Sequence, residues 1–102
     1  MSPKKAKADQ IAVSVVIPSY NAERFIEKCL DSLYLHEQNF TYEIIVVDSS
    51  SDSTPNIILQ KFPQVRLIHL DQQAYPGTAR NIGVEKSRGE IIAFLDSDCV
   101  AQ

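Results

Sequence analysis

The run from Ile91 to Leu95 constrains the fold of this chain more than any other feature of the sequence. Its five consecutive apolar residues are too few for a core helix and lack helical periodicity. They therefore predict a strand that is buried on both faces of a parallel sheet. Asp96 and Asp98 follow directly, spaced two apart. Because open parallel sheets bind ligands at the carboxyl ends of their strands, these two carboxylates lie where a ligand would bind.

Three further strands are predicted from apolar runs of similar length. They cover residues 13–17, 44–47 and 65–70. The first ends before Pro18, which has no N–H to donate to a sheet, and the second ends at the carboxylate of Asp48.

Helical patterns separate the four strands. The predicted helices cover residues 22–33, 55–62 and 78–87. Asn21 is the expected N-cap of the first, whose apolar residues recur with helical spacing and predict one buried face. Thr54 and Pro55 supply an N-cap and a first-turn proline for the second. Gly89 lies just past the end of the third, where a glycine is favoured as the C′ residue.

This alternation of strands and helices predicts an α/β domain with a Rossmann-like parallel sheet and helices on both faces. We expect strand order 3-2-1-4, because it places the switch point between the first and fourth strands, where a crevice opens. Residues 12–102 are assigned to this domain, and residues 1–11 to a flexible basic tail that lacks the apolar segment of a signal peptide.

Composition narrows the possible functions. A chain of 102 residues makes one small domain, and a net charge of −3 gives no reason to expect nucleic-acid binding. No apolar run approaches the length of a transmembrane helix. Cys29 and Cys99 have no metal-ligand or redox spacing; Cys29 is expected to pack in the core, and two free thiols fit a reducing cytoplasm. His36 is expected to be a solvated loop residue.

The carboxylates at the strand ends suggest chemistry. Asp48 and Asp96 follow buried apolar runs directly, so they would be partly desolvated and need a partner, whereas ordinary loop polarity accounts for Asp52 and Asp71. Carboxylates that only accept hydrogen bonds suit Mg²⁺ or Mn²⁺, and such a cation suits a diphosphate. A simple polar turn explains Asp96 and Asp98 equally well when they are taken alone.

The third predicted helix carries two unusual residues. Arg80 falls in the first turn, where the helix dipole disfavours a cation, so an anion is expected nearby. The alternative is a surface arginine paired with Glu85 or with a loop acid. Gly83 lies inside the helix at a cost of about 1 kcal/mol relative to alanine, which a close approach between helix and sheet would explain.

Four blocks of sequence, in this order, carry a resemblance to a known family: residues 13–21, 43–48, 79–83 and 89–98. Together they resemble the N-terminal, nucleotide-binding part of a family 2 glycosyltransferase of the GT-A fold. The resemblance spans nearly everything from Val13 to Asp98. Each block is weak by itself, but their order and spacing make the combination specific.

The resemblance implies a role for particular residues. Three of them, at the end of the first strand, would line the nucleotide pocket: Pro18, Tyr20 and Asn21. Asp48 would accept a hydrogen bond from the base, typically the N3–H of uracil, and Arg80 would hold the nucleotide. Asp96 would contact the ribose. Asp98 would ligate the Mg²⁺ or Mn²⁺ ion that bridges the diphosphate.

The resemblance also implies a reaction. Family members carry out an inverting, metal-dependent transfer from a nucleotide diphosphate sugar, here expected to be a UDP-sugar. Their acceptor site and acidic general base lie further along the chain, so the base is expected beyond Gln102 and this chain alone is expected to bind without turnover. The family usually has more acids and a glycine after the second strand. Here the segment is Ser49 to Thr54, which leaves Asp52 without an assigned role.

Other interpretations compete with this one. A non-catalytic nucleotide-binding or protein-interaction module could keep the same fold. An unrelated doubly wound signalling receiver would want a lysine at a late strand end, and none follows Lys86. Because no charge, proline or bulge interrupts residues 91–95, the exposed edge of the fourth strand is expected to form a homodimer. The expected location is cytoplasmic, or at the membrane periphery in a longer parent protein.

Overall fold

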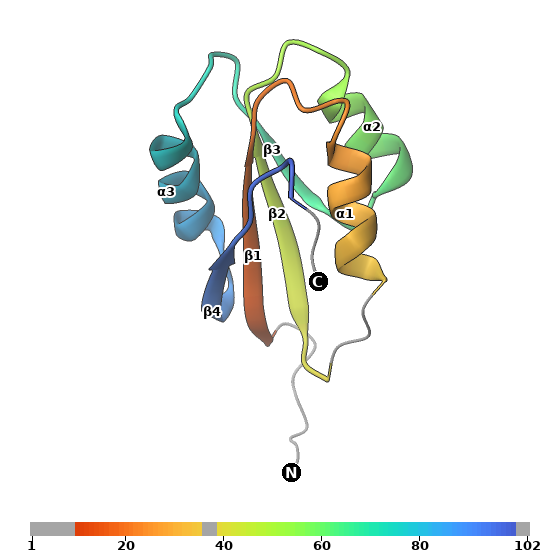
Figure 1. Cartoon of the computed structure of the whole chain (residues 1–102). Helices are drawn as coiled ribbons and strands as arrows, with labels where there is room; N and C mark the ends of the chain where they lie inside the picture. The colour runs from red at the N-terminus through yellow and green to blue at the C-terminus, as the bar shows by residue number, and fades with distance from the viewer. Residues whose placement is uncertain (1–9, 36–38, 100–102) are drawn as a thin grey trace.

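The computed structural model describes residues 10–35 and 39–99, which form a parallel sheet and three helices (Figure 1). In chain order the elements are β1 (Ile11–Ser19), α1 (Ile26–Tyr34), β2 (Tyr42–Asp48), α2 (Thr54–Lys61), β3 (Arg66–His69), α3 (Pro76–Lys86) and β4 (Gly89–Phe94). His36 and residues 1–9 of the predicted tail lie outside the described residues. No helix within the described ranges has both the length and the apolar character needed to cross a membrane.

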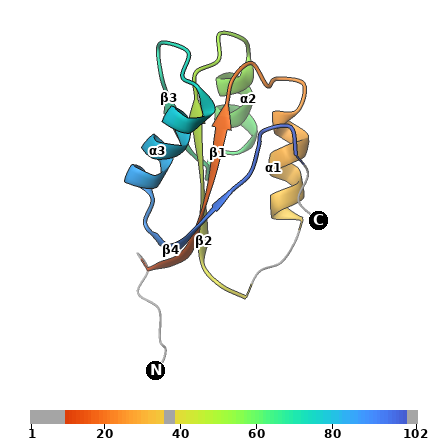
Figure 2. The ribbon, with the colours of Figure 1, turned by 60° about the vertical axis from the view of Figure 1, so that its left-hand side comes forward.

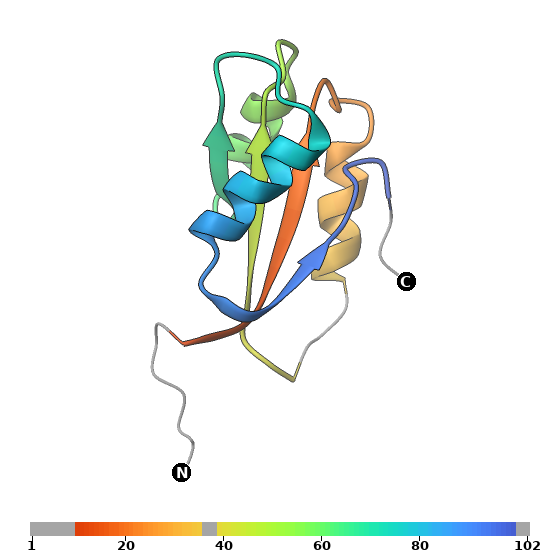
Figure 3. The same ribbon diagram turned by 90° about the vertical axis from the view of Figure 1, so that its left-hand side faces the viewer.

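The strand order is β3-β2-β1-β4, and the predicted topology is therefore confirmed. Every neighbouring pair is parallel, with Val15 opposite both Ile44 of β2 and Ala93 of β4. Helix α3 covers one face of the sheet and α1 and α2 cover the other (Figures 1 and 3). The larger core lies under α1 and α2, where Ile17, Ile26 and Ile58 are fully buried.

The helix glycine of α3 lies against the sheet, as predicted. A Cβ atom added at Gly83 would lie 2.3 Å from Cγ1 of Val16, so only glycine allows α3 to approach β1 this closely. The prediction for Gly89 was wrong, because this residue begins β4 and does not adopt a left-handed C′ conformation. A Cβ there would lie 2.6 Å from the backbone nitrogen of Ser14, so this glycine allows β4 to approach β1.

The end of β1 differs from the prediction at two residues. The strand continues through Pro18 to Ser19, because β4 pairs with β1 only as far as Val16 and no partner needs the missing N–H of Pro18. Asn21 is not the N-cap of α1. It has a φ of 48°, which asparagine tolerates well, and α1 begins five residues later at Ile26.

Strand β4 is not buried on both faces. Among the strands that the structure describes it pairs only with β1, so it is an edge strand, and Ile91 and Phe94 are 62% and 50% exposed. Its apolar composition predicted burial because strands of this kind normally have cover on both faces. Within the described residues, one edge and much of the surface of β4 remain open.

A buried polar cluster joins the strands at their amino ends. Glu43 accepts hydrogen bonds from the Ser14 hydroxyl at 2.6 Å, from Arg66 at 2.8 Å and from the backbone N–H of Arg88 at 2.7 Å. Burial alone would raise the pKa of Glu43, but these donors outweigh it and the pKa is lowered. The cluster links β1, β2, β3 and the start of β4 at the end of the sheet opposite the predicted site.

Candidate functional site

The loops that follow β1, β2 and β3 gather at one end of the sheet, where Figure 2 shows them together at the top of the molecule. A cleft of about 560 Å³ lies at this end, between the end of β1, the start of α3 and the loop after β4. Six of the seven predicted site residues line it: Pro18, Tyr20, Asn21, Arg80, Asp96 and Asp98. The seventh, Asp48, does not.

The loop after β4 presents exposed acids to the cleft. Asp96 and Asp98, with Cys99, place one potential ligand atom each within 4.8 Å of one another. Two carboxylates are suitable ligands for Mg²⁺ or Mn²⁺, so the chemistry of the donors fits the predicted cation. Nη2 of Arg80 lies 3.3 Å from Oδ1 of Asp96. Arg80 is therefore paired with a loop acid, and because both side chains are exposed this contact is weak enough to yield to a ligand.

Helix α1 packs against the acidic loop that follows β4. The thiol of Cys29 donates to the carbonyl oxygen of Asp96 at 3.7 Å, and the backbone N–H of Cys99 donates to the same oxygen at 3.0 Å. Burial, with a smaller contribution from the negative charges of Cys99 and Asp98, raises the pKa of Cys29 to about 11. Cys29 is fully buried, as predicted, and as a neutral thiol it packs against the turn that carries the acids.

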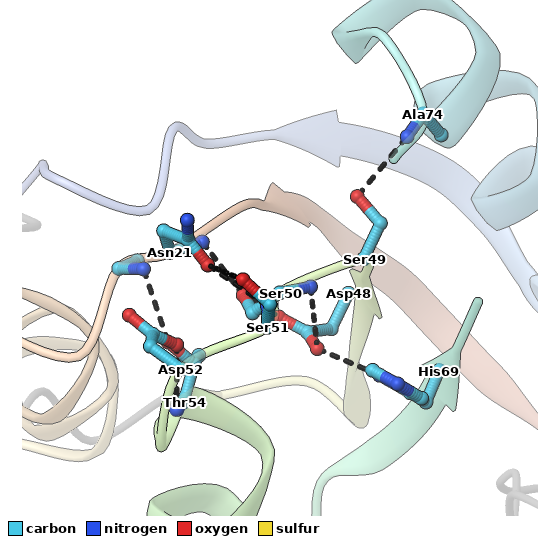
Figure 4. A network of polar contacts seen from close by, with 10 residues as sticks. Asn21, Asp48, Ser49, Ser50, Ser51, Asp52, Thr54, His69 and Ala74 are labelled. Atoms are coloured by element: carbon cyan, nitrogen blue, oxygen red, sulfur yellow. Dashed lines mark hydrogen bonds and ion pairs between the residues drawn. The ribbon is translucent and has the colours of Figure 1, made fainter. Parts of the chain in front are cut away.

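Asp48 lies at the carboxyl end of β2 and is fully buried (Figure 4). Its Oδ1 accepts from the Ser50 hydroxyl at 2.5 Å. Its Oδ2 accepts from the Ser50 N–H at 3.1 Å and lies 2.9 Å from Nδ1 of His69. Both carboxylate oxygens are thus occupied by neighbouring groups of the chain. A nucleobase could reach Asp48 only after some of these contacts had opened.

The serine-rich loop after β2, residues 49–54, also holds Asn21 in the wall of the cleft (Figure 4). The backbone N–H of Asn21 donates to the Ser50 hydroxyl at 2.7 Å, and Oδ1 of Asn21 accepts from the Ser51 N–H at 2.9 Å. The next N–H along the chain, that of Ala22, donates to the buried hydroxyl of Thr54 at 3.0 Å. These contacts explain why Asn21 takes a left-handed conformation instead of capping α1.

Asp52 has a structural role in this loop. It accepts from the hydroxyl and the backbone N–H of Thr54, at 2.5 and 2.9 Å, and from the N–H of Glu23 at 3.3 Å. Burial alone would raise the pKa of Asp52, but these hydrogen bonds outweigh it and the pKa is lowered. Asp52 therefore shapes the start of α2 and ties it to the loop after β1.

Sequence reasoning missed part of the cleft wall. Gln73 and Ala74 line the cleft from the loop after β3, and the Ala74 N–H donates to the Ser49 hydroxyl at 3.1 Å. Topology could have identified this segment, because all carboxyl ends of a parallel sheet meet at one edge. Phe25 also lines the cleft and is 47% exposed, although its helical spacing predicted a place on the buried face of α1.

Comparisons with known proteins agree with this geometry. A family model described as "Glycosyl transferase family 2" matches residues 14–102. Glycosyltransferase AglE of Haloferax volcanii is 40% identical over 92 residues, and the succinoglycan biosynthesis protein ExoO of Rhizobium meliloti is 42% identical over 88 residues. These matches cover 85% and 84% of this chain but only 30% and 25% of the relatives, so the chain spans less than a third of their length.

Solved structures show the same fold. S. aureus TarS 1–349 in complex with UDP-GlcNAc superimposes with a TM-score of 0.77 and 33% identity, over 86% of this chain and 27% of that one. The mannosyltransferase PcManGT from Pyrobaculum calidifontis, in complex with GDP-Man and Mn²⁺, gives a TM-score of 0.73 and 30% identity, over 89% of this chain and 28% of that one.

Proposed function

The chain belongs to glycosyl transferase family 2, and from this premise we propose that it is the nucleotide-sugar-binding part of an inverting, metal-dependent glycosyltransferase. The observation that carries the proposal is the cleft itself. Residues from three separate parts of the sequence, all of them expected from the sequence to bind a nucleotide, line one cavity. Similar structures in complex with UDP-GlcNAc or with GDP-Man and Mn²⁺ support a nucleotide-sugar ligand, and a UDP-sugar is our first choice.

Each wall of the cleft has a proposed task. Pro18, Tyr20 and Asn21, held by the serine-rich loop, form the side against which the nucleoside lies. Arg80 exchanges its exposed contact with Asp96 for the negative charge of the diphosphate, and Asp96 becomes free to accept from the ribose hydroxyls.

Asp98 is the proposed protein ligand of Mg²⁺ or Mn²⁺. The ion would supply Lewis-acid stabilisation of the leaving diphosphate. Asp48 remains the predicted partner of the base, which requires its contacts with Ser50 and His69 to rearrange.

The transfer step needs more than this chain. An inverting transfer requires a base that deprotonates the acceptor hydroxyl. We assign that base, and the acceptor site, to the part of the relatives that this chain does not span. This chain by itself would then bind the donor without turnover.

Calorimetric titration of UDP, with and without Mn²⁺, tests the proposal. For the unaltered chain we expect Mn²⁺ to raise UDP affinity by about tenfold or more, equivalent to 1.4 kcal/mol. Asp98→Asn should remove this enhancement without affecting the fold. Asp31→Asn, which changes an exposed carboxylate on α1, is the matched control and should keep it. A full Mn²⁺ effect in Asp98→Asn would refute the metal assignment.

No UDP binding at millimolar concentration would favour the alternative, a protein-interaction module of the same fold. The partner would then be a second copy of the chain, bound at the exposed edge of β4. Its unpaired backbone and the exposed Ile91 and Phe94 suit a two-fold pairing of β4 strands. Light scattering at micromolar concentration should then report a dimer, and a clean monomer would contradict this part of the proposal.

A further inference from the structure

Phe25 is an exposed aromatic residue whose position the nucleotide-binding roles above do not explain. It precedes α1 directly, lines the cleft and is 47% exposed. The guanidinium of Arg24 lies over its ring, 5.8 Å from the ring centroid. A half-exposed apolar ring in the wall of a polar cleft is the kind of surface that orients a ligand.

The position of Phe25 follows from its contacts. Its carbonyl oxygen accepts from the N–H of Cys29, one helical turn later, at 3.0 Å. The thiol of Cys29 in turn lies 3.7 Å from the carbonyl oxygen of Asp96. Phe25 therefore adjoins the turn of α1 that packs against the acidic loop, and it lines the same cleft as Asp96 and Asp98.

The other exposed ring that lines the cleft, Tyr20, adjoins a different segment. Its neighbour Asn21 is tied to Ser50 and Ser51 in the loop after β2. Two exposed aromatic side chains, Tyr20 and Phe25, thus line the same cleft as the acids after β4. A ligand with a ring at each end of a charged linker would use both.

We infer that Phe25 contacts the sugar of the bound nucleotide sugar and makes the cleft prefer the complete donor over the free nucleotide. The inference rests on the proposed function, because it needs the diphosphate to lie near Asp98. The sugar is attached directly to that diphosphate and therefore lies within reach of the same end of the cleft. Hexoses have a face of C–H groups that packs against aromatic rings. The guanidinium of Arg24, stacked over the ring, helps to hold it in place.

The test compares UDP with UDP-GlcNAc and UDP-glucose, all with Mn²⁺, by calorimetric titration of the chain. Phe25→Leu should weaken binding of both UDP-sugars by about three- to tenfold, the range expected for one aromatic contact, and leave UDP affinity unchanged. Phe25→Tyr should restore the preference for the UDP-sugars. Phe40→Leu is the matched control, since Phe40 is 46% exposed and packs on Tyr42 at the opposite end of the sheet.

Three outcomes would overturn the inference. Equal losses for UDP and UDP-sugars would place the ring against the nucleotide. Unchanged affinities for all three ligands would leave the ring without a role in donor binding. A loss in Phe25→Leu that Phe25→Tyr does not restore would point to altered packing. If the unaltered chain binds none of the ligands, the proposed function fails first, so the two failures are distinguishable.

Discussion

The loops after β2 and β4 carry acids at the same end of the sheet, but the two sets of acids differ in their exposure and in their hydrogen bonds. In the first loop, Asp48 and Asp52 accept hydrogen bonds from neighbouring serine, threonine, histidine and backbone groups. In the second, Asp96 and Asp98 are exposed, and among the described residues their side chains make one long contact with Arg80 and one weak contact with the Cys99 thiol. In this structure the acids of the first loop are held by the chain itself and those of the second remain available to a ligand, so the base contact proposed for Asp48 requires its own contacts to open first.

Burial explains the difference. Asp48 is fully buried, and an ionised carboxylate at that depth is tolerated only when donors surround it. Ser50 donates both its hydroxyl and its N–H to Asp48, and Nδ1 of His69 lies 2.9 Å from the same carboxylate. The loop after β4 is solvated, so its carboxylates can keep free lone pairs at little cost. Position at a strand end alone therefore does not identify a ligand-binding acid.

The largest expected effect is the loss of stability in Asp48→Ala. This change leaves the buried N–H and hydroxyl of Ser50 without their acceptor, and each unsatisfied buried group costs about 1–3 kcal/mol. We expect the free energy of unfolding to fall by about 2–5 kcal/mol in urea titrations. Asp98→Ala, at an exposed position, should change it by less than about 0.5 kcal/mol.

Similar stability losses in the two variants would break the comparison. A small loss in Asp48→Ala, together with weaker UDP binding, would move Asp48 into the group of ligand-binding acids. That result would support the base contact predicted from the sequence.

Much of the fold could be predicted because it depends on local patterns. Apolar runs of strand length, alternating with helical spacing, specify a parallel sheet, and the handedness of its crossovers leaves few strand orders. The same topology brings Tyr20, Arg80 and Asp98 to one edge, so most of the site followed from the fold. The role of Gly83 could also be predicted, because a glycine inside a helix is favoured where a neighbouring element leaves no room for a Cβ atom.

The remaining features depend on which residues meet across the fold. The local sequence does not show whether Gly89 ends a helix as its C′ residue or allows close contact with Ser14 on the neighbouring strand. The left-handed Asn21 is set by a hydrogen bond that it donates to Ser50 and one that it accepts from Ser51, in a loop 29 and 30 residues away. The exposed edge of β4 followed from the strand order, but the exposure of its faces did not. An apolar composition indicates a strand suited to burial on both faces, and the described residues cover only part of β4.

The smallest expected effect concerns Asp52 and its dependence on pH. The pKa of Asp52 is lowered from its ordinary value of 3.8 in the folded chain, so folding favours the ionised carboxylate. Its contribution to stability is therefore fully present above pH 3.8 and is lost as the pH falls through the lowered, folded-state pKa. Asp52→Asn should reduce stability by less than about 1 kcal/mol at neutral pH, because the amide oxygen can still accept hydrogen bonds.

The difference in unfolding free energy between the unaltered chain and Asp52→Asn should shrink toward zero as the pH falls below 3.8. Urea titrations at a series of pH values measure it, and Asp31→Asn on α1 controls for the loss of one exposed negative charge. A difference that stayed constant down to pH 2 would mean that the geometry of the amide, and not the charge of the carboxylate, limits the variant. A difference that grew with acidity would mean that folding raises the pKa of Asp52, which is the opposite sign of linkage.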